Sequence, residues 1–447
     1  MTGTHARRDA DIDHSGVPAS LAGAAVAPGD AGYAAVRSTY LRGGSPGLVL
    51  RPRTPGEVAD ALGFARAQPV PLSLRSGGHG VSGRSTNHGG VVIDLSRLDA
   101  IEILDEESRR VRVGPGARWG DVAAALAPHG WAISSGDYGG VGVGGLATAG
   151  GIGWLVREHG LTIDHLRAVD MLLADGSPVR ASATENPDLF WAVRGAGANF
   201  GIVTSFEFEA HEVGQVGFAR LVFDATDLPG FLRRWGAAME AAPRDLTSFL
   251  ITGAPRPGQP PLAQVMAVVD AADAETVVDR LQPLAATAPL LDHAIQILPY
   301  PAIMHTPPDV HNGHGEPVAR SAFAEHLTPD LASAAACLVA GGDAYFFQIR
   351  SVGGAVADVA PDATAYAHRA ANFQLTALGP SRKRLDHGWD GMQDQFSGLY
   401  LSFETDLRPE RLHDAFPPAT LRRLRELKLR HDPDNVFRDN FNIAPPG

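Results

Sequence analysis

The segment Arg75-Ser76-Gly77-Gly78-His79-Gly80 (RSGGHG) decides the fold, and the rest of the chain is interpreted outward from it. It follows the apolar run PLSL, which predicts a strand that ends at the first glycine. Consecutive glycines let backbone N–H groups converge on an anion, and Arg75 adds positive charge. On its own the segment fits a tight turn capped by a histidine equally well.

Two further glycine-rich segments lie in the same half of the chain. They are GDYGGVGVGGLATAGGIG at residues 136–153 and GAGANFGIV at residues 195–203. Each such loop costs backbone entropy on folding, so three of them need a common reason. A long, phosphate-bearing cofactor that lies along one domain would explain all three together.

An alternative interpretation is a nicotinamide site in the second segment. Gly140, Gly142 and Gly145 satisfy the G-x-G-x-x-G pattern, and Asp164 lies at a suitable distance for a ribose contact. That motif requires a preceding apolar strand and a following helix, whereas WAISSGDY before it is short and polar. An NAD-dependent dehydrogenase therefore stays an alternative with weak support.

Length and composition indicate two domains and exclude several classes of protein. The chain has 447 residues, 44% of them hydrophobic, and a net charge of −12 with no basic cluster. We therefore expect neither nucleic acid nor an anionic membrane as a partner. Cys337 is the only cysteine, which excludes an intrachain disulfide, and we interpret it as a small buried hydrophobe. Without an apolar leader or span, the protein is expected to be cytoplasmic.

The strand and helix pattern changes near residue 212, which sets the predicted domain boundaries. Short strands and helices separated by glycine loops precede this point, and long strands alternating with helices follow it. The predicted division is a loose tail at 1–17, a cofactor domain at 18–212, a substrate domain at 213–404, and a segment at 405–447 that completes the cofactor domain. The fold class is α+β.

Several motifs together resemble one known family. They are RSGGHG, GGVVIDLS, VGVGG with GGIGWL, ADGS, NPDLFWAVRGAGANFGIVTSFEFE and HDPDNVFRDNFNI. In this order they resemble the berberine-bridge-enzyme-like FAD-linked oxidases of the vanillyl-alcohol-oxidase type, also called PCMH-type. The nearest pattern is the bacterial branch that 6-hydroxy-D-nicotine oxidase typifies. The resemblance implies a two-lobed FAD-binding domain and an antiparallel sheet-and-helix substrate domain.

The resemblance also implies a covalent flavin. In the family the histidine of R-S-G-G-H bonds the 8α-methyl carbon of the flavin, and this residue is His79 here. The imidazole is a good nucleophile near neutral pH, and the methyl group becomes electrophilic in the quinone-methide tautomer. Plant relatives add a link from a cysteine, but Tyr138 stands at that position, so a single bond is predicted.

Further FAD-binding residues follow from the matching motifs. Arg75 to Gly80 would wrap the pyrophosphate, and Val141 matches the position that controls access of O2. The other predicted cofactor residues are Gly136, Asp137, Gly142, Val143, Gly145, Gly151, Gly153, Gly201, Ile202, Val203, Asn440 and Asn442.

The implied reaction is hydride transfer from a small organic substrate to flavin N5, with O2 as the electron acceptor. The substrate would be an alcohol, an amine, a sugar or a secondary metabolite. The base of many relatives is the second tyrosine of Y-x-N-Y, where this chain has Phe403. Tyr400 and Tyr138 are therefore the candidate catalytic residues, and a core-packing role for Tyr400 is equally supported. A non-catalytic flavin-binding protein stays a second alternative.

Two histidine patterns receive structural interpretations. His305, His311 and His314 are irregularly spaced, so a substrate cleft or surface loop is expected there rather than a metal. Asp164 and His165 are expected to support a turn rather than to act as an acid and base.

Overall fold

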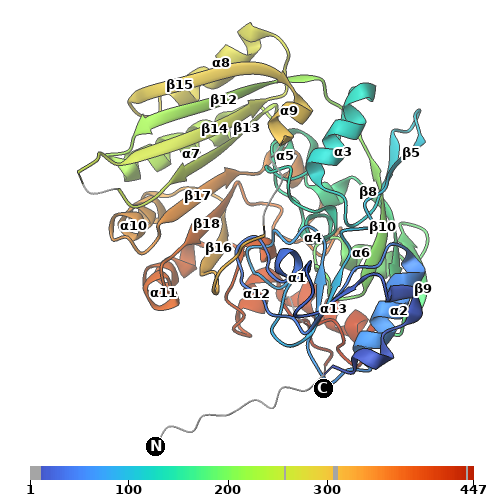
Figure 1. Ribbon diagram of the computed structural model, residues 1–447. Helices are drawn as coiled ribbons and strands as arrows, with labels where there is room; N and C mark the ends of the chain where they lie inside the picture. Colours follow the sequence, from blue (N-terminus) through green and yellow to red (C-terminus); the bar gives the residue numbers. More distant parts are fainter. Residues whose placement is uncertain (1–11, 256–257, 306–310, 439–440, 447) are drawn as a thin grey trace, which may run out of the picture.

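Three main sheets organise the chain in the computed structural model, which describes residues 12–255, 258–305, 311–438 and 441–446. In Figure 1 two of these sheets lie in one lobe, and the third, which is larger, lies in a second lobe beside it. The α+β class that the sequence predicts is confirmed.

The first sheet carries the strand that leads into RSGGHG. In order across the sheet its strands are β1 (Ala25–Val26), β2 (Leu48–Leu50), β4 (Val91–Asp94) and β3 (Leu72–Arg75). The last three run parallel, because helix α2 (Pro55–Arg66) connects β2 to β3. The Thr54 hydroxyl accepts a hydrogen bond from the Glu57 N–H at 3.1 Å, so the predicted helix start is confirmed. Along the chain the short helix α1 (Tyr33–Val36) lies between β1 and β2.

The second sheet of this lobe is antiparallel and built from hairpins. Its strands are β5 (Ile101–Asp105), β6 (Arg110–Val113), β10 (Ile202–Glu209), β8 (Leu166–Leu172) and β9 (Pro178–Ser182). The two hairpins predicted from sequence, β5–β6 and β8–β9, are confirmed. A small pair, β7 (Trp131–Ala132) and β11 (His211–Glu212), lies beside them. The helices here are α3 (Trp119–Leu126), α4 (Val143–Ala149), α5 (Val156–His159) and α6 (Pro187–Val193).

The third sheet has seven antiparallel strands and forms the centre of the second lobe. Its order is β15 (Leu290–Pro299), β12 (Gln215–Asp224), β14 (Leu262–Val269), β13 (Leu246–Thr252), β17 (Phe346–Ser351), β18 (Phe373–Leu378) and β16 (Ala319–Ala324). One face shares a core with α7 (Leu228–Ala241), α8 (Ala274–Ala285), α10 (Pro329–Ala340) and α11 (Arg382–Asp390). The opposite face turns Phe249 and Val268 into the core of the first lobe.

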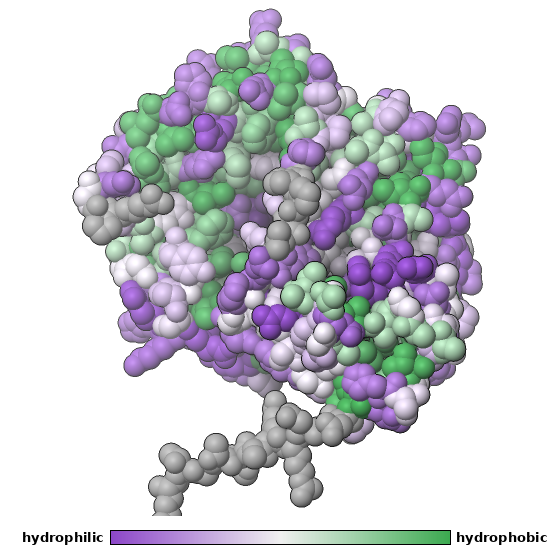
Figure 2. Space-filling view, viewed as in Figure 1, coloured by the Kyte–Doolittle hydropathy of each residue, from purple (hydrophilic) through white to green (hydrophobic). Residues whose placement is uncertain are grey.

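The last helices return to the first lobe. They are α12 (Arg411–Ala415) and α13 (Pro418–His431), and α13 packs on α6. Leu421, Leu424 and Leu427 share one buried side of α13, as the sequence predicts. Seen from the same direction, hydrophilic side chains gather around the hollow between the lobes (Figure 2).

Three expectations differ from the structure. Within the tail predicted to be loose at 1–17, the Ile12 side chain is buried and joins the core beneath α2. Cys337 is exposed on α10 rather than buried, because it lies on the side of the helix that faces away from the sheet. Strand β15 was not identified, since its residues are exposed on both sides and show no clear alternation.

Candidate active site

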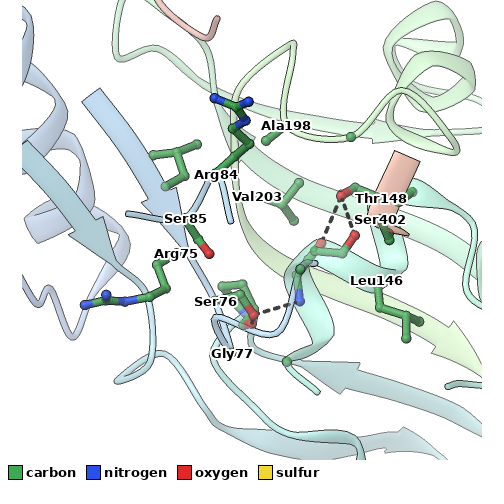
Figure 3. A pocket seen from close by; sticks show the side chains of 18 of the residues that line it. Arg75, Ser76, Gly77, Arg84, Ser85, Leu146, Thr148, Ala198, Val203 and Ser402 are labelled. Atoms are coloured by element: carbon green, nitrogen blue, oxygen red, sulfur yellow. Dashed lines mark hydrogen bonds between the residues drawn. The ribbon is translucent and has the colours of Figure 1, made fainter. Parts of the chain in front are cut away.

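A cavity lies in the first lobe between its two sheets, and all three glycine-rich segments line it (Figure 3). The residues predicted to bind the cofactor or to act in catalysis that do line it are Arg75, Ser76, Gly77, Gly78, His79, Gly80, Gly136, Asp137, Val141, Gly142, Gly145, Gly201, Ile202, Val203 and Tyr400. Segments far apart in the sequence therefore meet around one space.

The first two glycine loops touch backbone to backbone. A Cβ atom on Gly77 would lie 2.3 Å from the Gly142 nitrogen, and one on Gly142 would lie 2.1 Å from the Gly77 nitrogen. The Ser76 hydroxyl fixes this contact, because it accepts from the Gly144 N–H at 3.2 Å and donates to the Pro115 carbonyl at 2.5 Å. The contact requires glycine at both positions.

The Arg75 side chain is paired inside the protein, although Arg75 also lines the cavity. Its guanidinium is buried and donates to Asp94 at 2.9 Å, and Figure 3 shows the side chain running away from Ser76 and Gly77. Burial raises the pKa of Asp94, but Arg75 and hydrogen bonds from Ser96 outweigh it, so the pKa lies below its ordinary value. The charge of Arg75 is therefore paired with Asp94, and Arg84 is a second arginine that lines the cavity.

His79 lies half-buried among three rings. Tyr40 stacks on it with ring centroids 4.8 Å apart, Tyr138 lies at 5.5 Å, and His311 lies edge-on at 5.6 Å. Gly78 has a φ of +68°, and a Cβ there would lie 2.9 Å from His311 Cε1. The turn thus needs glycine so that this ring can approach, and His311 belongs to the surroundings of His79.

Some predicted cofactor residues lie away from the cavity. Val143 is fully buried in the core, and a Cβ on Gly151 would lie 2.0 Å from the Thr162 hydroxyl. Gly153 packs against the Gly136 carbonyl, and Asn442 and Tyr138 do not line the cavity. Asn440 lies outside the described residues. Gly151 and Gly153 therefore let neighbouring segments pack closely, although neither glycine lines the cavity.

Tyr400 lies at one end of the cavity, beside Ser402 and Phe403. Its hydroxyl oxygen accepts a hydrogen bond from the Gly151 N–H at 3.0 Å. Burial raises the pKa of Tyr400, although the hydrogen bonds from Gly151 and Ser402 partly offset this effect. The ring also packs edge-on against Phe403 and Phe323, so Tyr400 is both a core residue and a lining residue.

A buried ion pair joins the second lobe to the cavity wall. Arg350 of β17 donates from Nε and Nη2 to one oxygen of Asp137, at 3.1 and 3.0 Å. The Arg350 guanidinium also lies 4.3 Å from the Phe403 ring centroid. The pair therefore fixes Asp137 and Phe403 at the junction of the lobes.

The remaining polar residues noted in the sequence have structural partners. Asp164 accepts two hydrogen bonds from Arg369 at 2.8 and 2.9 Å, and His165 Nδ1 lies 2.7 Å from His211 Nε2. Asp164 is therefore available neither for a ribose nor as an acid partner for His165. Within the described chain no strand leads into Gly140, so the nicotinamide alternative lacks its structural context.

Sequence reasoning missed part of the cavity wall. The missed lining residues include Leu72, Leu74, Leu95, Arg84, Ser85, Thr148, Ala198, Phe200, Val436 and Phe437. The alternation of Leu72 and Leu74 in β3 was the available signal, since residues two apart share one face of a strand. For Arg84 and Ser85 the sequence carries no comparable signal.

Comparisons with known proteins show which proteins the chain is similar to. Residues 46–182 match the model of the FAD binding domain family. The chain is 28% identical to (R)-6-hydroxynicotine oxidase of Paenarthrobacter nicotinovorans, over 96% of this chain and 98% of that protein. The structure of Physcomitrella patens BBE-like 1 matches with a TM-score of 0.84 and 20% identity, over 95% of this chain and 98% of that one.

A third comparison concerns the form of the cofactor. Glucooligosaccharide oxidase from Acremonium strictum, described with a 6-S-cysteinyl, 8α-N1-histidyl FAD, matches with a TM-score of 0.81 and 23% identity, over 95% of this chain and 97% of that one. None of the helices in the described ranges is both long and apolar enough to span a membrane. The chain is therefore an FAD-linked oxidoreductase that resembles the berberine-bridge-enzyme-like oxidases, among them the bacterial nicotine oxidase.

Proposed function

We propose that this oxidase holds FAD through a single covalent bond to His79 and uses O2 to reoxidise it while it oxidises a small organic substrate. The observation that carries the proposal is that three separate glycine loops line one cavity that His79 also lines. We also propose the division into domains at 18–212, 213–404 and 405–447, because the seven-stranded sheet uses only residues 215–378.

The cavity suits FAD on physical grounds. Gly145 lines it, and a Cβ there would meet no atom within 4 Å, so the backbone is open to a large ligand. The apolar side chains of Leu72, Leu74 and Phe437 line part of the cavity and suit one of the flat ring systems of FAD. Arg84 also lines the cavity and carries a positive charge that suits the phosphates. When bound, FAD supplies the acceptor for the substrate hydride and the donor to O2.

The covalent bond would join an imidazole nitrogen of His79 to the flavin 8α carbon. Forming it breaks one N–H bond of the imidazole and one C–H bond of the methyl group. The two electrons and two protons released are finally taken up by O2 as hydrogen peroxide. The rings of Tyr40, Tyr138 and His311 hold the imidazole in place before the bond forms. The histidyl FAD in the name of the glucooligosaccharide oxidase supports this assignment.

Tyr400 is our proposed base for the substrate proton. It lines the cavity, and the Gly151 N–H hydrogen bond stabilises a negative charge on its oxygen. Tyr138, the other candidate, contacts His79 instead. The substrate class stays an alcohol, an amine, a sugar or a secondary metabolite, as the sequence suggests.

The linkage is tested by viewing a denaturing gel under ultraviolet light and by measuring intact mass. Wild-type protein should give a fluorescent band and a mass increased by one FAD less two hydrogens. His79→Ala should lose the fluorescent band and the added mass and still bind FAD reversibly. His88 is exposed and does not line the cavity, so the control His88→Ala should keep the band and the added mass. Wild-type protein that releases all its flavin on denaturation would refute the bond.

The base is tested by comparing Tyr400→Phe with wild type for a substrate found in a peroxide-release screen. Loss of the proton acceptor should lower the rate of flavin reduction by about 10²- to 10⁴-fold, with the flavin still bound. Unchanged reduction would exclude Tyr400 and leave it a packing residue. A flavin that no candidate substrate reduces would favour the non-catalytic alternative.

A further inference from the structure

We propose that Glu158, His159 and Asp270 form a site for a divalent transition-metal ion, with Zn²⁺ the best match, that bridges the two lobes. The proposal is independent of the flavin site, because none of the three residues lines the cavity. Glu158 and His159 end helix α5 of the first lobe, and Asp270 directly follows strand β14 of the second.

The geometry suits a small ion with mixed ligands. One ligand atom from each of the three residues lies within 4.8 Å of the others. The His159 Nε2 and Asp270 Oδ2 atoms are 3.3 Å apart. Two ligands held 2.0–2.2 Å from a tetrahedral ion are about 3.4 Å apart, and imidazole with carboxylates is a ligand set that zinc accepts.

One carboxylate oxygen at this place has no partner in the described part of the chain. Glu158 Oε2 is buried, and no residue of the described ranges donates a hydrogen bond to it. The Asp270 carboxylate belongs to the same cluster. A bound cation would give the buried oxygen a partner and reduce the repulsion between the two carboxylates.

Neighbouring rings pack against the His159 imidazole. The His211 ring stacks on it with centroids 4.4 Å apart, and His211 Nε2 lies 2.7 Å from His165 Nδ1. These contacts hold the imidazole in place beside Asp270.

The alternative is an ordinary polar contact in which His159 hydrogen-bonds Asp270 without any metal. The test uses untagged holoenzyme treated with a chelator and then dialysed free of it. Zn²⁺, Ni²⁺, Mn²⁺ and Mg²⁺ are titrated separately by calorimetry, and melting is followed by tryptophan emission. We expect one equivalent of Zn²⁺ to bind and the melting temperature to rise by roughly 2–5 °C at 100-fold excess over the dissociation constant.

The variants separate the two interpretations. Asp270→Asn keeps the shape of the side chain and should weaken Zn²⁺ binding at least tenfold, as should His159→Ala. Asp292→Asn, on the exposed strand β15, is the matched control and should bind like wild type. Absence of saturable Zn²⁺ binding to wild type, or binding that Asp270→Asn leaves unchanged, would overturn the proposal. Flavin content, read from its absorbance, should be equal in all four proteins, so failure here is distinct from failure of the flavin assignment.

Discussion

Lys428 provides the sharpest test of how the end of α13 supports the cavity. Its ammonium group is completely buried and donates to the Asn199 carbonyl at 2.7 Å, to Asp432 at 2.6 Å and to the Phe437 carbonyl at 2.7 Å. Asn199 belongs to the third glycine loop, and Phe437 lines the cavity. One side chain therefore connects two segments of the cavity wall that are far apart in the sequence.

Replacing Lys428 by Met removes the cation and keeps a similar volume. Asp432 then stays buried with only the Val436 and Phe437 N–H groups as donors, and two carbonyls lose their partner. Removal of one partner from a buried ion pair costs about 3–5 kcal/mol of unfolding free energy. For a chain of this size we expect the melting temperature to fall by roughly 3–8 °C.

The assay is thermal melting, followed by tryptophan and by flavin emission, with Lys383→Met on the exposed side of α11 as the control. The double variant Lys428→Met with Asp432→Asn should recover part of the loss, because it no longer leaves a buried charge unpaired. A fall of less than 1 °C in the single variant would refute this account of the pair. So would a double variant no more stable than the single one.

Two further variants test the glycine contact and a buried histidine. Gly77→Ala should prevent stable FAD incorporation, because its Cβ would lie 2.3 Å from the Gly142 nitrogen. The control Gly63→Ala lies in open space on α2 and should raise the free energy of unfolding by about 0.5–1 kcal/mol. Flavin absorbance per chain and thermal melting are measured for both variants, and normal flavin content in Gly77→Ala would contradict the contact. Burial lowers the pKa of His368 below 6.5, so the unfolded chain binds more protons between the two pKa values and stability falls as pH drops from about 7 to 5. His368→Gln should reduce the dependence of the melting temperature on pH, whereas the control His88→Gln, at an exposed position, should leave it unchanged. Equal pH dependence in both variants would rule out His368 as its cause.

Much of the fold was predictable because the signals are local. The start of α2 depends on the Thr54 cap, and the hairpins depend on short polar turns between alternating strands. The glycine loops were also recognisable, because only glycine allows backbones to meet as Gly77 and Gly142 do.

The rest of the site depends on partners that lie far away in the sequence. Arg75 looked like a phosphate ligand, but Asp94, nineteen residues later, binds its charge. Asp137 looked like part of a cofactor loop, and its partner is Arg350 of the other lobe, 213 positions away. Tyr138 follows a loop residue directly and yet points to His79. Such side-chain directions are set by tertiary packing, which a single sequence does not encode locally.

The wall of the cavity is assembled from residues as early as Leu72 and as late as Arg438. During synthesis the ribosome therefore releases the histidine turn long before the strip at 436–438 that closes the opposite end. A growing chain can fold β3 and β4 early, but the binding cavity for a dinucleotide is incomplete until residue 438 has emerged. Cofactor capture must accordingly be among the last events in maturation, and a chain cut short before this strip would fold much of its framework while remaining colourless.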